Sequence, residues 1–309
     1  FYLIFQLMLA FASFTAISYV ILKSQKKNIA ALQILIMLTF LTDDMYILVQ
    51  FTKTSSIAVM GGSILFIWAV FKNSSWITKL AGAIIVILGS LLRFEAIYIC
   101  GIFIIIIIIV EVMKALNSYT ECYKKARKIV TAFAQGIFLI SIVFLLEFVN
   151  DVLMKNRLEY SDYSRFNSAR STIVDYSNDG IGINDETFSN IDLNYYDFLM
   201  ITKWEFGDSR IFNTDNMQVV AAKTSNMRKG IHFGYKEIVK QMWERRYYKY
   251  HLVWAIAILT IVTLIYGSKR NRILTVITIS GMWCLLFYFY FIIRVLYRIE
   301  FSILAAGFI

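Results

Sequence analysis

Arg93 and Glu95 interrupt an apolar stretch that extends from about residue 80 to residue 110. An ionisable side chain at membrane depth costs free energy, and it is therefore a candidate functional residue. Further charges lie directly beside other apolar runs: Asp43, Asp44, Lys53, Arg294, Arg298 and Glu300. We predict that these charges gather at one membrane surface and form the site of the protein's chemistry.

The basic members of this set suit a phosphate group. Arg offers paired hydrogen-bond donors to phosphate oxygens, and Lys contributes a compact positive charge. We therefore predict that four residues bind the phosphate of a lipid-linked substrate: Lys53, Arg93, Arg294 and Arg298. The alternative is that these side chains pair with neighbouring carboxylates, or reach to lipid headgroups and hold the helix ends in place.

A carboxylate in the same site could act as general base on an acceptor hydroxyl, or coordinate a divalent cation on a diphosphate. We predict catalytic roles for Asp43, Asp44 and Glu95, and the chemistry suggests a divalent cation as cofactor. Alternatively, Asp43 and Asp44 are hydrated loop residues without a catalytic role. No metal site built from protein ligands is expected, because the two histidines and three cysteines lack ligand spacing.

A hydrophilic segment at 150–249 separates the apolar runs. Within it, residues 175–186 match the pattern of an EF-hand calcium loop, with Gly180 at position six and Glu186 at position twelve. Flanking helices and a second loop are not evident, so a turn rich in Asn, Asp and Gly is the better explanation. The segment has no pattern of a catalytic triad, phosphate loop or zinc site, and we expect it to cover the charged site.

The elements that position these residues are apolar. The chain is 59% hydrophobic, with a mean hydropathy of +0.63, which is typical of a polytopic membrane protein. We predict an all-α polytopic membrane protein with about eight transmembrane helices, at 1–22, 29–42, 57–71, 80–92, 96–110, 129–149, 250–267 and 273–293. Gly61 and Gly62 would let another helix pack closely against the third of these.

The predicted spans divide the chain into three parts. Residues 1–149 hold the first six helices, 150–249 form one extracytoplasmic insertion of mixed or α structure, and 250–309 hold two helices and a C-terminal apolar stub. The sequence starts without Met inside an apolar run, so we expect an N-terminal part to be missing.

Short basic loops predict the orientation. Lys and Arg cluster at 23–27, 72–79, 114–128 and 269–272, and eight crossings place these loops on one side. We predict that this side is the cytoplasm, with 150–249 outside. The net charge of +10 is then mainly a topology signal, and nucleic acid is not expected as a partner.

With this orientation, Arg93 and Glu95 form an outer corner between two spans. The runs at 29–42, 80–92 and 96–110 are short, since about 13 residues cover only roughly 20 Å of a hydrocarbon core about 30 Å thick. Short spans recess their outer ends below the membrane surface. We therefore predict an outward-facing cavity that is lined by polar groups.

Several short stretches carry a family resemblance: 50–54, 89–95, 167–170 with Asp175 and Tyr176, 196–204 with Asp208, and Arg294 with Val295. Together they resemble bacterial polytopic membrane glycosyltransferases with a glycosyltransferase C (GT-C)-like architecture. The resemblance implies transfer of a sugar from a polyprenyl-phosphate-linked donor on the extracytoplasmic side, with membrane lipid and the donor as partners. Such enzymes usually carry the catalytic acid in their first outer loop, and in this protein that loop would precede Phe1. Asp43-Asp44 resembles the acidic doublet of these enzymes, but it lies in a later loop of this chain.

We therefore predict a membrane glycosyltransferase of cell-envelope glycan or glycolipid assembly. Two other classes stay open: a transporter or flippase of a lipid-linked or anionic substrate, and a non-catalytic envelope membrane protein. The two halves of the sequence show no visible inverted repeat of the kind that many transporters contain.

Overall fold

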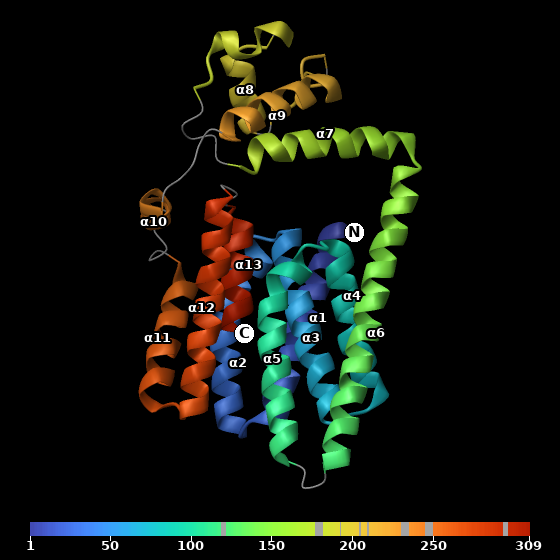
Figure 1. Ribbon diagram of the computed structural model, residues 1–309, viewed down its shortest axis with the longest axis vertical. Helices are drawn as coiled ribbons and strands as arrows, with labels where there is room; N and C mark the ends of the chain where they lie inside the picture. The colour runs from blue at the N-terminus through green and yellow to red at the C-terminus, as the bar shows by residue number, and fades with distance from the viewer. Residues whose placement is uncertain are drawn as a thin grey trace. The chain divides into compact units, whose positions relative to one another are not determined.

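The computed structural model describes residues 1–118, 122–176, 182–191, 193–203, 205–208, 210–229, 235–244, 250–292 and 296–309. All regular structure in these ranges is helical, which confirms the all-α prediction (Figure 1). In the described residues, 6 helices are long and apolar enough to cross a membrane. The expected number of eight spans requires in addition two shorter apolar helices, Trp76–Leu92 and His251–Tyr266.

The chain divides into two compact units. The first contains Phe1–Glu147, Arg246–Leu286 and Tyr297–Ile309. Its helices are α1 (Tyr2–Ser24), α2 (Lys27–Thr42), the π-helix η1 (Asp43–Ile47), α3 (Phe51–Phe71), α4 (Trp76–Leu92), α5 (Ala96–Ser118), most of α6 (Cys122–Lys155), α11 (His251–Tyr266), most of α12 (Lys269–Phe291) and α13 (Tyr297–Phe308).

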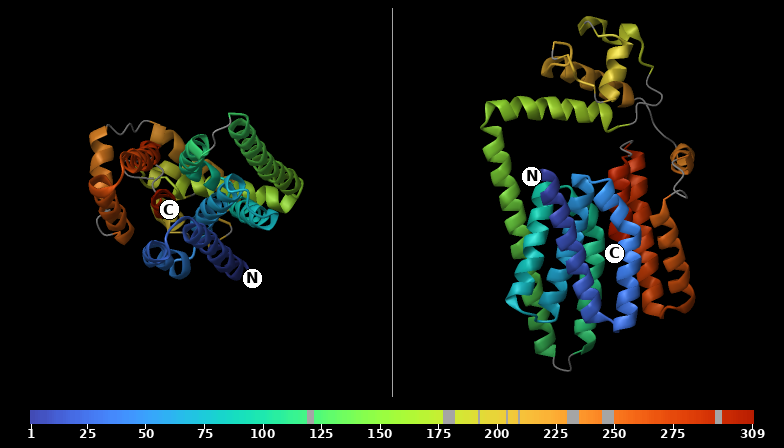
Figure 2. Two further views of the ribbon diagram at one scale, coloured as in Figure 1. Left: turned by 90° about the horizontal axis from the view of Figure 1, so that it is seen from below. Right: turned by 180° about the vertical axis from the view of Figure 1, so that it is seen from behind.

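Helix α3 is the central element of the first unit. It packs against α1, α4, α5 and α13, while α11 and α12 lie on the side of α2 and α13, away from α4 (Figures 1 and 2). A Cβ at Gly61 would lie 2.9 Å from the Ser13 carbonyl oxygen, and one at Gly62 would lie 2.7 Å from the Val86 amide nitrogen. The two glycines therefore let α3 approach α1 and α4 closely, as their position in the sequence predicts.

Two of the three runs that we expected to be short are full-length helices. Residues 29–42 extend through η1 to Ile47, which gives a continuous helical segment of 21 residues. The run at 96–110 continues as α5 to Ser118, because Glu111 and Lys114 form an ion pair one helical turn apart and do not end the helix. Only α4 stays shorter than the roughly 20 residues that span a bilayer, although it begins at Trp76 and has 17 residues instead of the 13 predicted.

The C-terminal stub is a buried helix. α13 has 12 residues, which is too short to cross a membrane at 1.5 Å per residue, and it packs against α3, α5 and α11. Its residues from Ile299 to Ala306 are buried. Gly307 faces the flexible side chain of Met282 on α12, which a Cβ at this position would displace.

The first unit has two distinct ends. The turns α1–α2, α3–α4 and α11–α12 lie at one end, together with the beginning of α6, and they carry most of the unit's basic residues (Figure 1). Helix η1 and the α4–α5 corner lie at the other end. This arrangement separates the basic loops from the charges that the sequence singles out as a site.

The second unit contains Phe148–Arg245 and Phe287–Leu296. Its helices are α7 (Leu158–Val174), the 3₁₀ helix η2 (Asp185–Ile191), α8 (Tyr195–Thr202), α9 (Thr214–Lys229) and α10 (Tyr235–Glu244). Asn194 and Asp197 form a capping box that starts α8. The unit has its own apolar core, in which Ile173, Phe188, Ile201, Met217 and Val220 are almost completely buried.

Candidate functional site

The candidate site is built on the first turns of α3. Gln50 is the N-cap residue, in an extended conformation and without a capping hydrogen bond from its side chain. The next polar residues, from Thr52 to Ser56, are all buried. We expected the span to begin at residue 57, because this polar run is typical of a loop. The structure shows instead that it forms the buried end of the central helix.

Lys53 is the buried cation of this run. Its Nζ atom donates a hydrogen bond to Asp44 Oδ1 over 2.6 Å, and the side chains of Lys53 and Asp44 are 3% and 20% exposed. The Lys53 ammonium also lies 4.6 Å from the centre of the Tyr297 ring and 5.0 Å from that of Phe301. These contacts place the ammonium in an aromatic cage with one carboxylate, which offsets the cost of its burial.

Tyr297 connects the C-terminal helix to this pair. Its hydroxyl donates to Asp44 Oδ1 over 2.6 Å, so one carboxylate oxygen accepts from both Tyr297 and Lys53. The π-helix η1 positions Asp44 for these contacts, and π-helical turns are often associated with functional sites. Sequence reasoning missed Tyr297, because its partner lies 253 residues away in the chain.

Arg93 forms a second group of contacts at the same end of α3. Its Nη1 atom donates to Thr52 Oγ1 over 2.6 Å, and its guanidinium lies 5.4 Å from the centre of the Phe51 ring. The Nε atom lies 3.4 Å from Glu95 Oε2, and the side chains of Arg93 and Glu95 are 12% and 63% exposed. Arg93 is thus held from three sides while Glu95 faces outward.

Ser55 fixes the corner that carries Arg93. Its hydroxyl lies within hydrogen-bond distance of two carbonyl oxygens at the end of α4, 2.6 Å from that of Gly89 and 3.0 Å from that of Arg93. Because α4 ends at Leu92 and α5 begins at Ala96, Arg93 and Glu95 lie in the turn between two helices. The structure therefore agrees with a corner rather than a charged pair inside one long helix.

The remaining predicted residues are more scattered. Asp43 is exposed on η1, next to Asp44 in the sequence. Arg298 is half-buried in the first turn of α13, where its carbonyl oxygen accepts from the Ser302 hydroxyl. Glu300 is buried on the same helix. Arg294 lies outside the described residues.

Adjacent residues on α3 join the two groups of contacts. Thr52 contacts Arg93 and Lys53 contacts Asp44, so η1, α3, the α4–α5 corner and α13 all meet at this helix end. We call Asp44, Thr52, Lys53, Arg93 and Tyr297 the α3 cluster. It offers a guanidinium, a hydroxyl and the uncapped N-terminus of a helix, which are groups that bind anions.

Within the described residues, no group of three or more His, Cys, Asp or Glu side chains could hold a metal ion. Asp43 and Asp44 therefore offer at most part of the coordination shell of a cation that arrives with a diphosphate. The EF-hand-like stretch at 175–186 lies partly outside the described residues, since 177–181 are not described. Asp175, at its start, is buried at the end of α7.

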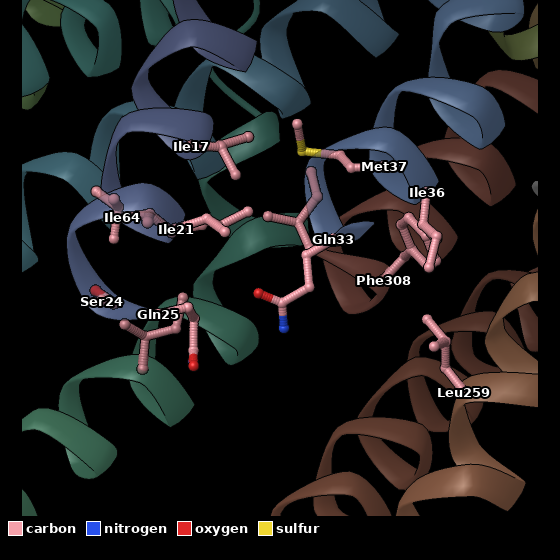
Figure 3. Close-up of a pocket in the computed structure, with 13 residues that line it drawn as sticks. Ile17, Ile21, Ser24, Gln25, Gln33, Ile36, Met37, Ile64, Leu259 and Phe308 are labelled. Carbon is pink, nitrogen blue, oxygen red and sulfur yellow. The ribbon is translucent and has the colours of Figure 1, made fainter. Parts of the chain in front are cut away.

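The described part of the chain contains pockets of about 370, 520 and 410 Å³, and none of these is lined by a residue of the α3 cluster. The first lies between α1, α2, α11 and α13, and its lining is mainly apolar, with Gln33 pointing into it (Figure 3). The polar cavity that we expected around Arg93 is not among these pockets.

No protein-family model matches the chain, and neither a curated protein nor a solved structure shows significant similarity to it. The functional assignment therefore depends on the geometry of the site and on the resemblance of the short sequence stretches.

Proposed function

We propose that the protein is a membrane glycosyltransferase that transfers a sugar from a polyprenyl-phosphate-linked donor at the extracytoplasmic face of a bacterial cytoplasmic membrane. The product would be a cell-envelope glycan or glycolipid. The observation that carries this proposal is the position of Arg93 beside the uncapped N-terminus of α3. The resemblance of residues 50–54 and 89–95 to GT-C-like enzymes supports it, because these two stretches are the ones that meet in the α3 cluster.

Arg93 is the residue to which we assign the donor phosphate. Its Nη1 atom is held by Thr52, and the exposed Glu95 carboxylate occupies its Nε edge at 3.4 Å. The donor phosphodiester shares one negative charge between two non-bridging oxygens, and both can accept hydrogen bonds from a guanidinium, so the donor can replace Glu95 there. The first amides of α3 then face the same anion, since Gln50 provides no side-chain cap.

We propose different roles for the other candidates. Lys53 and Asp44 are engaged with each other, so we propose that they hold η1, α3 and α13 together rather than contact substrate. Asp43 is exposed next to this pair, so we propose it as the carboxylate that takes a proton from an acceptor hydroxyl. For Arg294 and Arg298, we keep the proposal that they bind a second phosphate.

The test is sugar transfer by the purified full chain in liposomes, with undecaprenyl-phosphate-linked radiolabelled hexoses as donors. We expect Arg93→Ala to lower transfer at least 100-fold, because no other side chain replaces its paired donors, and Arg93→Lys to recover only part of the loss. Glu95→Gln should change the apparent KM for the donor more than kcat. Arg210→Ala is the matched control, since Arg210 is an exposed arginine of the second unit. Activity of Arg93→Ala equal to that of the wild type would refute the site.

One observation favours a second candidate, a transporter of an anionic or lipid-linked substrate. Buried ion pairs between membrane helices are typical of transport and proton pathways, and Lys53 with Asp44 is such a pair. Transport would require both residues to change partners, so Asp44→Asn would abolish uptake into liposomes while leaving Arg93-dependent donor binding intact. A glycosyltransferase would release a labelled product without net movement of the donor across the bilayer.

A further inference from the structure

A second charged feature lies at the opposite end of the first unit. A pocket of about 410 Å³ is formed where the end of α3, the first turn of α4 and the beginning of α6 meet. Its polar lining consists of Asn73, Lys79, Arg127, Lys128, Thr131 and Gln135, and the buried side chains of Val70 and Ala132 complete it. We call this cavity the basic pocket.

The basic pocket is positive, and two of its cations are not neutralised. No carboxylate lines it, and Lys79 and Arg127 have no ion-pair partner in the described part of the chain. Charges that only mark the cytoplasmic side of a membrane protein need no cavity. Here three cations from two helices line one hollow, which indicates a site for an anion.

The polar lining continues from the membrane surface into the membrane. Arg127, Thr131 and Gln135 follow one another at intervals of four residues on α6, so they share one face of that helix. Gln135 lies two turns beyond Arg127, roughly 12 Å along the helix axis. Its side-chain amide makes no hydrogen bond within the described residues. A polar amide at such a depth is costly unless a partner reaches it.

The surroundings of the basic pocket indicate where that partner comes from. On α6, Thr131 is exposed, and Phe138, eleven residues after Arg127 and therefore on the same face of the helix, is exposed as well; in a membrane this face would contact lipid acyl chains. A ligand that reaches both Arg127 and Gln135 therefore lies along the lipid-facing side of the helix. Free phosphate would remain in water near Lys79 and Arg127, whereas the glycerol and headgroup of a phospholipid extend toward Thr131 and Gln135.

We propose that the basic pocket binds the headgroup of an anionic phospholipid, with Lys79 and Arg127 on the phosphate and Gln135 on a headgroup hydroxyl or ester oxygen. The Thr131 hydroxyl donates to the Arg127 carbonyl oxygen over 2.8 Å, so it would accept from a headgroup hydroxyl. Basic pockets between helices at the cytoplasmic membrane surface are a known way to hold such lipids. The site is independent of the proposed glycosyl transfer, because no residue of the α3 cluster lines it. Its role would be to hold α4 and α6 together at the membrane surface.

The experiment is a titration of the purified full chain, in neutral detergent, with dioleoylphosphatidylglycerol, with lipid binding followed by native mass spectrometry. We expect saturable binding of one lipid, and at least ten-fold weaker binding for Lys79→Gln/Arg127→Gln. The matched control is Lys26→Gln/Lys27→Gln, which removes two exposed charges from another turn at the same end and should change the affinity less than two-fold. Equal losses in the two double variants would show diffuse attraction and overturn the proposal.

Two further measurements complete the test. The first distinguishes a lipid headgroup from a free phosphate, and the second uses a variant that is expected to fold. Inorganic phosphate and glycerol 3-phosphate should not displace the lipid at millimolar concentration, and displacement by either would show that the pocket takes a free phosphate. Thr131→Val/Gln135→Leu keeps every charge and suits a membrane helix, so it should fold. We expect it to weaken phosphatidylglycerol binding at least three-fold, and unchanged binding would overturn the placement of the headgroup in this cavity.

Discussion

Lys53 is the residue on which the packing of the α3 cluster depends. Its ammonium is almost completely buried, and Asp44 is its carboxylate partner. Replacing Asp44 by Asn would leave this charge in place while removing the opposite charge. We expect Asp44→Asn to destabilise the protein by about 3 kcal/mol, since breaking a buried ion pair from one side leaves an uncompensated charge. Thermal unfolding in detergent would measure the change.

Two further variants test whether the buried charge of Lys53 causes the loss of stability in Asp44→Asn. Asp43→Asn removes the same kind of charge from the neighbouring exposed residue and should change stability by less than about 0.5 kcal/mol. Lys53→Met combined with Asp44→Asn removes both charges, so it should recover most of the lost stability. If the double variant were as unstable as Asp44→Asn alone, the buried charge would not be the cause.

Residue patterns identified several members of the cluster but not their partners. Charges beside apolar runs were visible in the sequence, and Asp44, Lys53 and Arg93 do lie together in the structure. That Lys53 pairs with Asp44 instead of facing a substrate depends on η1, whose π-helical turn has no clear sequence signal. Tyr297 could not be found from local patterns, because it follows a predicted span in a distant part of the chain.

Helix α3 is the element around which the first unit is organised, and its crossing with α4 depends on glycine. A Cβ at Gly62 would lie 2.7 Å from the Val86 amide nitrogen and 2.8 Å from the Gly82 carbonyl oxygen. These are backbone atoms, which cannot move without shifting α4. We therefore expect Gly62→Ala to destabilise the protein by about 1–3 kcal/mol, measured as a lower midpoint of thermal unfolding.

Gly101 provides the matched control for this crossing. It is also a helical glycine of the first unit, on α5, and a Cβ there would meet nothing within 4 Å. Gly101→Ala should therefore be neutral or stabilise the helix by up to about 1 kcal/mol. A loss of stability at Gly101 as large as that at Gly62 would mean that any added methyl group is harmful, and the close crossing would not explain the effect.

Helix existence was easier to predict than helix length. Apolar runs marked α1 to α6, α11 and α12 but not η1, and the pair of Arg93 and Glu95 marked the corner between α4 and α5. The predicted end of α5 was wrong, and the helical segment that begins with α2 continues beyond its predicted end as η1. Helix α5 continues through Glu111 and Lys114, which pair with each other, and α2 is followed directly by η1, which contains Asp43 and Asp44. The partner of Glu111 comes from the same helix, whereas the partners of Asp44 come from α3 and α13 and depend on packing.

At the scale of the whole first unit, the two ends differ in chemistry. The end with the α1–α2, α3–α4 and α11–α12 turns is basic, and it holds the basic pocket. The other end holds the α3 cluster, in which Lys53 and Arg93 are matched by Asp44 and Glu95. By the positive-inside rule, the basic end should face the cytoplasm and the α3 cluster should face outward.

Cysteine labelling in intact cells would test this orientation. The background lacks Cys100, Cys122 and Cys284, and single cysteines replace exposed residues at the basic end (Lys26, Lys72 and Ser268) or at the other end (Asp43 and Glu95). A maleimide that cannot cross membranes should label only the second set from outside. All five positions should react after the membrane is permeabilised, which controls for accessibility.

Because consecutive helices alternate in direction, labelling of Lys72→Cys together with Glu95→Cys from outside would mean that α4 does not cross the membrane. That outcome would remove α4 from the spans and would place the basic pocket on the outer side together with the α3 cluster, so the lipid site could not keep its assigned cytoplasmic face.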